Sequence, residues 1–105
     1  QKGAAVNLAN NDGETALYRA CLYNRIQTVK ALHQHGANLN VYARGNYPLH
    51  WAIECKYFSL MKVLISLGAN TELCDENGRD ALALMKEKYD RSVGWEIFNL
   101  IEKQY

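Results

Sequence analysis

The sequence predicts an all-α fold, a solenoid of stacked helix–turn–helix units joined by β-hairpin-like links. Two recurring phrases predict it. The first phrase is a glycine followed four residues later by leucine, and it begins at Gly13, Gly45 and Gly78, so successive glycines lie 32 and 33 residues apart. The second phrase begins with Gly-Ala and keeps the same step, at Gly3, Gly36 and Gly68. A fixed period of this length is typical of repeat proteins, whose units bury their apolar faces against one another.

The spacing of apolar residues predicts two short helices in the first unit. The inward positions of its first helix, spaced i, i+3 and i+4, hold Leu17, Ala20 and Cys21. Those of its second helix hold Ile26, Val29, Leu32 and His33. Gly36 then ends the second helix, because glycine readily adopts the left-handed conformation.

Two further units repeat this pattern. In the second unit, Pro48 starts a helix with inward Leu49, Ala52 and Ile53, and Met61, Leu64 and Ile65 mark its partner. In the third unit the inward residues are Leu82, Met85, Ile97, Leu100 and Ile101. The loop 90–94 is longer than its counterparts, as is common in a terminal, capping unit. The link around 41–44 is one residue shorter than the other two.

We therefore expect one domain over 1–105. It divides into the tail of a preceding unit at 1–9, units at 10–41 and 42–74, and a C-terminal capping unit at 75–105. The predicted core consists of Leu17, Ala20, Val29, Leu32, Leu49, Ala52, Ile53, Met61, Leu64, Leu82, Ile97 and Leu100.

The composition excludes several function classes. Among 105 residues, 49% are hydrophobic, and 12 basic against 11 acidic residues give a net charge of +1. This balance argues against a nucleic-acid-binding protein, which would carry a basic stripe, and against a disordered tail. The apolar runs are too short to cross a bilayer, so we expect no membrane span.

Cysteine and histidine usage points to an intracellular protein without a metal. Cys21, Cys55 and Cys74 are an odd number of separated thiols, which is typical of a reducing compartment, cytoplasmic or nuclear. A zinc site needs paired ligands at short spacing, and His33 and His35 point to different faces of a helix. We expect no metal site and no cofactor.

The residues around each recurring glycine resemble the ankyrin repeat, with its pattern D-x-x-G-x-T-P-L-H-x-A, a second helix with V-x-x-L-L, and G-A-D-V-N. The first element appears at 10–20, 45–52 and 75–82, and the resemblance covers the whole chain. Thr15 is kept only in the first unit, and Pro48 and His50 only in the second. In the family, Thr and His fix the start of the first helix through hydrogen bonds. We expect looser hairpins where Tyr47 and Asp80 replace Thr.

The resemblance implies a non-catalytic protein–protein interaction module. Partners of ankyrin proteins usually touch the hairpin tips and the outward side of the first helices, which line a concave face. Carried over by position, the candidate partner-binding residues are Arg19, Tyr23, Tyr42, Arg44, Trp51, Glu54 and Arg79. Asp12, Glu14 and Leu84 are expected on the same face. Its mixed charge favours a protein or peptide partner.

Two readings of Trp51 stay open. On an exposed concave face, a tryptophan resembles a binding hot spot. Alternatively, Trp51 packs against the neighbouring hairpins and Tyr23.

Catalysis is not expected, because Cys21 falls at the inward position of Ile53, and His50 matches the structural His of the family. There are two alternative functions. The chain could be a regulatory segment of an enzyme or channel polypeptide, or it could hold a small ligand or nucleotide in the concave groove, at Trp51 and Arg19.

The chain opens inside a repeated phrase, which suggests a piece excised from a longer protein. We expect Val6, Leu8 and Ile26 to be partly uncovered at this open N-terminal end and to promote self-association.

Overall fold

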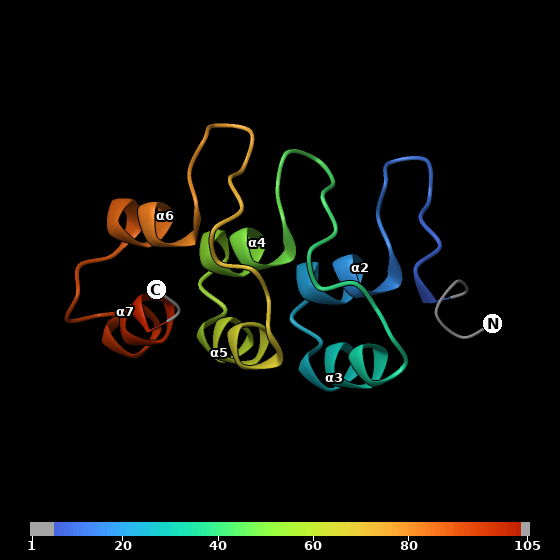
Figure 1. Ribbon diagram of the computed structural model, residues 1–105, viewed down its shortest axis with the longest axis horizontal. Helices are drawn as coiled ribbons and strands as arrows, with labels where there is room; N and C mark the ends of the chain where they lie inside the picture. Colours follow the sequence, from blue (N-terminus) through green and yellow to red (C-terminus); the bar gives the residue numbers. More distant parts are fainter. Residues whose placement is uncertain (1–5, 104–105) are drawn as a thin grey trace.

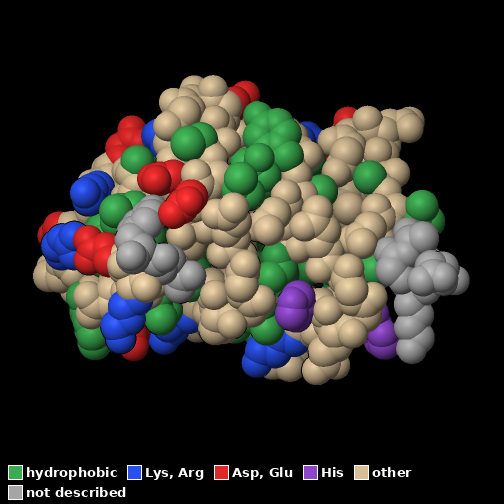
Figure 2. Space-filling model, viewed as in Figure 1, with side chains coloured by type: hydrophobic (Ala, Val, Ile, Leu, Met, Phe, Trp, Pro, Cys, Tyr) green, Lys and Arg blue, Asp and Glu red, His purple; other side chains and the backbone are tan. Residues whose placement is uncertain are grey.

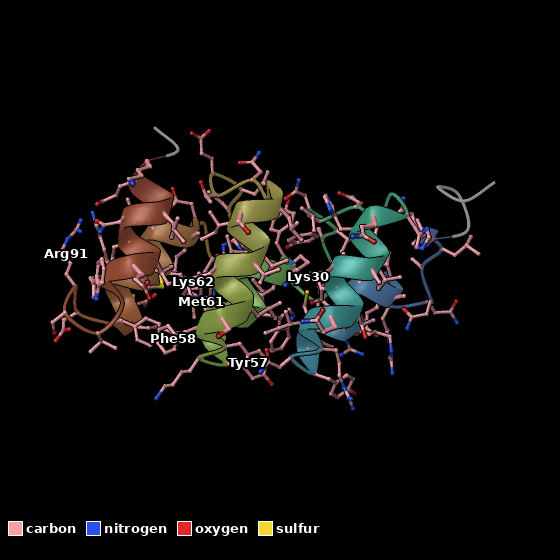
Figure 3. The ribbon with its side chains drawn as sticks, turned by 90° about the horizontal axis from the view of Figure 1, so that it is seen from below. Lys30, Tyr57, Phe58, Met61, Lys62 and Arg91 are labelled. Carbon is pink, nitrogen blue, oxygen red and sulfur yellow. The ribbon has the colours of Figure 1, made fainter. Side chains whose placement is uncertain are left out.

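The computed structural model describes residues 6–103, whose helices form two rows (Figure 1). The helices are α2 (Ala16–Leu22), α3 (Ile26–Gln34), α4 (Pro48–Glu54), α5 (Phe58–Leu67), α6 (Ala81–Lys88) and α7 (Trp95–Glu102). The first row holds α2, α4 and α6, and Figure 3 shows the second row, α3, α5 and α7, side by side. The molecule is elongated along the rows, at 43 × 25 × 25 Å. This arrangement confirms the predicted all-α stack of helix–turn–helix units.

Two of the three first helices begin at a side-chain cap. The Thr15 hydroxyl accepts a hydrogen bond from Tyr18 N at 3.2 Å, and the Asp80 carboxylate accepts one from Ala83 N at 2.8 Å. Aspartate is among the best N-cap residues. The expectation that the hydrogen bond fixing the helix start is lost where Asp80 replaces Thr is therefore wrong. At α4, Tyr47 makes no side-chain cap bond, and a proline follows at the first helical position, where its missing N–H has no partner to lose.

The links differ in their turns. In the middle link, Ala43 and Asn46 exchange two backbone hydrogen bonds of 3.0 Å around a two-residue turn. Arg44 and Gly45 have φ angles of 55° and 81°, as a type I′ turn requires. In the first link the backbone bond runs from Asn10 to Glu14 at 3.0 Å, around a turn one residue longer, and 75–79 repeats that geometry. The shorter middle link noted in the sequence is thus a tighter hairpin tip.

Asparagine side chains connect each unit to the backbone of the next. Asn7 Oδ1 accepts a hydrogen bond from Asn38 N at 2.8 Å. One repeat later, Asn40 Oδ1 accepts the equivalent bond from Asn70 N at 2.9 Å. These bonds fix the spacing of neighbouring units along the stack.

Two tyrosines make a second set of connections between units. The Tyr57 hydroxyl donates to the Leu22 carbonyl oxygen at 3.1 Å, and the Tyr89 hydroxyl donates to the Ile53 carbonyl oxygen at 2.6 Å. Both carbonyl groups lie near the C-terminal end of a first helix, where the last carbonyl groups lack a partner within the helix. The tyrosines therefore join the loop of one unit to the preceding first helix.

Most of the predicted core is buried, namely Leu17, Ala20, Val29, Leu49, Ala52, Ile53, Met61, Leu64 and Ile97. Three predicted members, Leu32, Leu82 and Leu100, are only partly buried and pack against the edge of the core. Tyr18 and Leu84 are fully buried and therefore belong to the core, although neither is in the predicted set. The expectation that Leu84 lies on the binding face is wrong, because α6 buries a different stripe that includes Leu84.

The first described residues partly match the expectation of an open end. Leu8 is exposed, and Val6 and Ile26 are partly buried. Self-association stays a prediction.

The predicted unit boundaries at 9/10, 41/42 and 74/75 also stay predictions. Residues 1–5 of the predicted tail and 104–105 of the capping unit lie outside the described residues. Among residues 6–103, no helix combines the length and the apolar character that crossing a lipid bilayer requires.

Candidate functional site

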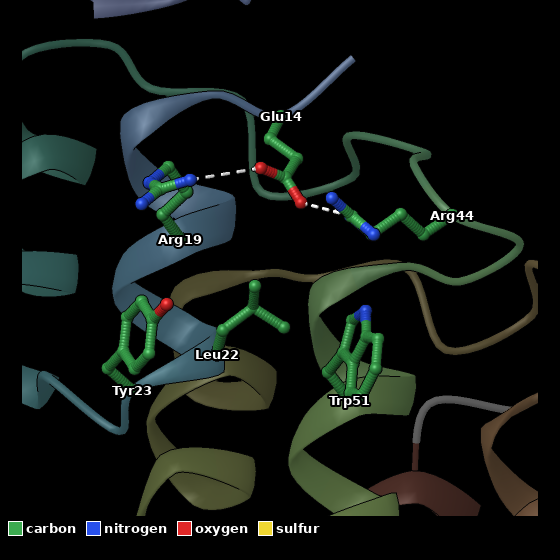
Figure 4. A pocket seen from close by; sticks show the side chains of 6 residues that line it. All are labelled: Glu14, Arg19, Leu22, Tyr23, Arg44 and Trp51. Atoms are coloured by element: carbon green, nitrogen blue, oxygen red, sulfur yellow. Dashed lines mark hydrogen bonds and ion pairs between the residues drawn. The ribbon is translucent and has the colours of Figure 1, made fainter. Parts of the chain in front are cut away.

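An open groove lies between α2 and α4, beside the first two hairpins (Figure 4). Its volume is about 440 Å³, and its lining residues are Glu14, Arg19, Leu22, Tyr23, Arg44 and Trp51. Helix α2 and its C-cap supply one wall, α4 supplies Trp51, and the hairpins supply Glu14 and Arg44. The structure thus brings four of the seven candidate residues together, and these are Arg19, Tyr23, Arg44 and Trp51.

Trp51 is half-buried, so it combines the two readings of the sequence. Its Nε1 donates a hydrogen bond to the Tyr18 hydroxyl, and that hydroxyl donates to the Ala43 carbonyl oxygen at 2.5 Å. Burial raises the pKa of Tyr18, which keeps the phenol protonated and able to donate. Trp51 is therefore fixed to the neighbouring unit and still forms part of the groove wall.

Glu14 holds the two arginines of the groove. Its side chain is only 2% exposed. One carboxylate oxygen accepts hydrogen bonds from Asn10 Nδ2 and Arg19 Nη1, both at 3.1 Å, and the other accepts from Arg44 Nε. The hydrogen bonds from Asn10 and Arg44 keep the pKa of Glu14 below its ordinary value. Glu14 was expected on the binding face; it lines the groove, but its carboxylate is buried and already paired.

The guanidinium groups around Glu14 remain accessible to solvent. The side chains of Arg19 and Arg44 are 53% and 52% exposed. Arg44 also bonds Asp12 at 3.0 Å, at the rim, and its hydrogen bond to Glu14 raises its own pKa. The lining contains two arginines and one carboxylate, so it carries one net positive charge.

Glu54 and Arg79 lie elsewhere, in a cluster of charges between α4 and α6. Arg79 contacts Asp75 at 3.0 Å, Glu87 at 2.5 Å and Glu54 at 3.6 Å, and Lys88 contacts Glu54 at 3.0 Å. Although burial raises the pKa of Asp75, hydrogen bonds from Arg79 lower it, and the pKa is lowered overall. The charged groups of this cluster are largely paired among themselves.

Tyr42 also lies outside the groove. Its ring packs on Tyr47 with the centroids 5.0 Å apart, and both residues belong to the link between α3 and α4. Figure 2 shows apolar side chains gathered over this part of the molecule. Tyr42, Glu54 and Arg79 stay predictions as binding residues, on surfaces separate from the groove.

The second tryptophan was not among the candidates. Trp95, at the start of α7, is 59% exposed, and the exposed Val93 precedes it. Lys62 of α5 contacts Glu96 at 3.3 Å beside it, and a small depression of about 100 Å³ lies there. In the register that aligns Ile97 with Met61 and Val29, Trp95 corresponds to Ser59 and Gln27, which are both exposed. A large apolar side chain at a position that is polar in the other two units is the signal that could have indicated an exposed surface of interest.

The cysteines and His50 were considered as catalytic residues. Cys21 and His50 are buried in the stack. Cys21 is fully buried, and burial raises the pKa of its thiol to about 12, whereas Cys55 and Cys74 are exposed and free. His50 is buried, and its Nε2 lies 2.8 Å from the Arg79 carbonyl oxygen of the next unit. Within residues 6–103, His, Cys, Asp and Glu side chains form no group of three that could hold a metal ion.

Helix–turn–helix units stacked in two rows and joined by glycine-tipped hairpins define a solenoid repeat protein. The family model for ankyrin repeats, in three copies, matches residues 2–75. The chain belongs to the ankyrin repeat family. Its repeats are generally protein–protein interaction modules, and the ankyrin domain is typically non-catalytic.

Several curated proteins are similar to this chain. It is 35% identical over 80 residues to BCL-6 corepressor-like protein 1 of Homo sapiens, a match covering 75% of the chain and 4% of that protein. It is 35% identical over 74 residues to Ankyrin repeat and SOCS box protein 11 of Mus musculus, covering 70% and 23%. Over 83 residues it is 29% identical to Palmitoyltransferase AKR1 of Debaryomyces hansenii, covering 78% and 10%. The chain thus spans at most 23% of these three relatives.

Proposed function

We propose that this chain is a non-catalytic recognition module that binds a protein or peptide in the groove between α2 and α4. The observation that carries the proposal is the immobilised indole of Trp51, set beside Leu22 and Tyr23 and below two accessible arginines. Tryptophan, tyrosine and arginine are the residues most enriched in binding hot spots. A side chain already held in one conformation loses little entropy when a partner binds.

The shape of the groove favours a macromolecular partner over a small ligand. Small-molecule sites bury roughly 70–90% of a ligand's surface. This groove is open to solvent over much of its extent, so a nucleotide would stay largely hydrated there. An extended segment or a loop of another protein would instead cover the groove and its charged rim together.

We also propose that this chain is part of a longer protein and that this protein is intracellular. One similar protein is named as a palmitoyltransferase, which supports the alternative that the module regulates an enzyme to which it is joined. The groove would have the same role in either arrangement. Free thiols at Cys55 and Cys74 support an intracellular, reducing environment.

The test is capture of proteins from a cell extract on the immobilised chain, quantified for wild type, Trp51→Ala and Trp95→Ala. The two variants remove the same side chain, in the groove and on α7. We expect Trp51→Ala to weaken the binding of captured partners by about 2 kcal/mol or more, roughly thirtyfold. Trp95→Ala should leave it unchanged.

Because Trp51 is bonded to Tyr18, thermal unfolding of the same preparations must show that Trp51→Ala is folded. Tyr23→Ala provides a second groove variant, since its exposed ring adds little to the core. Equal capture by wild type, Trp51→Ala and Tyr23→Ala would refute the groove as the binding site.

A further inference from the structure

We propose that the groove selects a partner segment that carries a carboxylate side chain close to a large apolar side chain. This inference rests on the proposed function and adds the chemistry of the partner. Two features carry it, namely the unused hydrogen-bond donors of the arginines and the apolar surface beside them.

The residues that line the groove carry one net positive charge, and the exposed Asp12 at the rim is already paired with Arg44. Glu14 is the acidic residue of the lining, and its buried carboxylate already accepts hydrogen bonds from three side chains. A basic group of a partner would therefore find the acceptors of Glu14 occupied and two guanidinium groups nearby. A carboxylate of a partner would instead meet cations that are half exposed.

The arginines keep donors for such a carboxylate. Arg19 donates to Glu14 from Nη1 alone, so its Nε and Nη2 are open. Arg44 uses Nε for Glu14 and Nη2 for Asp12, which leaves Nη1 open. A guanidinium fork with two adjacent open nitrogens matches the two oxygens of a carboxylate. Because Glu14 fixes both arginines, this geometry exists before a partner arrives.

The apolar part of the groove lies beside these donors (Figure 4). Leu22, Tyr23 and Trp51 form it, and the indole N–H of Trp51 is already bonded to Tyr18. The remaining surface of the indole therefore offers apolar contact. In an extended segment, side chains two residues apart project from the same side. An acidic residue and a leucine, phenylalanine or tryptophan at positions i and i+2 could thus occupy both parts of the groove.

The neighbouring charges favour one carboxylate over a polyanion. The next cluster along the row holds Glu54, Asp75 and Glu87 against Arg79 and Lys88, so it carries one net negative charge. A nucleic acid or a run of acidic residues that extended from the groove toward α6 would meet this negative cluster. A single acidic side chain at the groove avoids that repulsion.

The inference can be tested with a library of random peptides displayed on phage and selected on the immobilised chain. Parallel selections use Arg19→Gln, Arg19→Lys and Trp51→Ala, with Lys62→Gln as the control that removes a basic side chain outside the groove. Arg19→Gln leaves Glu14 bonded to Asn10 and Arg44, so the variant should remain folded, which circular dichroism checks.

We expect peptides from wild type and Lys62→Gln to be enriched in Asp or Glu two residues from a large apolar residue. On Arg19→Gln the acidic enrichment should vanish while the apolar enrichment persists, and Arg19→Lys should keep part of it, because lysine has the charge without the fork. For a selected peptide, replacing its acidic residue by the amide should weaken binding about tenfold for wild type and leave it unchanged for Arg19→Gln.

The failures are distinguishable. Peptides that need Trp51 but show no acidic enrichment, or an acidic enrichment that survives Arg19→Gln, would overturn this inference and leave the proposed function standing. If the selected peptides bind Trp51→Ala and Arg19→Gln as well as wild type, or if none is selected, both are overturned.

Discussion

Replacing Leu84 by alanine measures how tightly α6, the first helix of the third unit, is packed. Leu84 is 0% exposed, although its register position matches Arg19 and Trp51. The change removes three carbon atoms from the core, which costs about 2.4 kcal/mol in lost burial at about 0.8 kcal/mol each. The cavity left behind adds to this, so we expect a loss of about 3–4 kcal/mol in the free energy of unfolding.

Two leucines at the first position of the repeated stripe serve as controls. Leu49→Ala, in the middle unit between α2 and α6, should cost about 2–5 kcal/mol for the same reason. Leu82→Ala lies on the same helix as Leu84 but is only partly buried, and it should cost about 1–2 kcal/mol. Leu82 and Leu84 lie on the same terminal helix and differ in burial. A difference between their losses in free energy of unfolding therefore reports burial and not position in the stack.

Urea denaturation followed by circular dichroism gives the three free energies by linear extrapolation. The midpoint for Leu84→Ala should fall by about 1 M or more if the slope lies within the usual range of about 1–3 kcal/mol/M. A loss for Leu84→Ala equal to or smaller than that for Leu82→Ala would refute the packing of α6 described above.

Two further predictions concern titration and thiol reactivity. Glu14 has a pKa below its ordinary value of 4.5, so its carboxylate stabilises the fold above that pH, and the stabilisation disappears as pH falls through the lower native pKa. The difference in melting temperature between wild type and Glu14→Gln should therefore shrink between pH 5 and 3, and a constant difference would contradict a stabilising role for the hydrogen bonds of the Glu14 carboxylate with Asn10, Arg19 and Arg44. At pH 8, a thiol reagent should modify Cys55 and Cys74 quickly, and Cys21 only after unfolding, because Cys21 is buried and its pKa is about 12. Equal reactivity of all three thiols in the folded protein would contradict its burial.

The repeat register predicted where side chains lie along the stack, and it placed Arg19 and Trp51 on neighbouring helices of one surface. It could not predict which charges are satisfied internally. Glu14 is buried because Arg44, thirty residues later, reaches back to it from the tip of the next hairpin. Contacts between units depend on side-chain conformation, and the period of the sequence does not encode them.

Other differences between the predicted and the observed core could have been inferred from the local sequence. Tyr18 occupies the register position of His50, so the structural role assigned to His50 could have been extended to it. In α6, Lys86 stands where Cys21 and Ile53 are buried in the earlier units. A charged side chain disfavours burial there, and the helix buries Ala81, Leu84 and Met85 at i, i+3 and i+4 instead.

The asparagine bonds between units bear on how such a chain can grow. Asn7 and Asn40 each accept a hydrogen bond from a backbone N–H of the following unit, a group that every residue except proline provides. This one hydrogen bond therefore does not depend on the side chain of the residue that donates it, unlike the packing and side-chain contacts between the units. A tandem duplication of the middle unit would carry Asn40 with it and so supply this hydrogen bond at the new junction. At the corresponding position the third phrase has Glu72, so lengthening the stack at that end would call for an asparagine there.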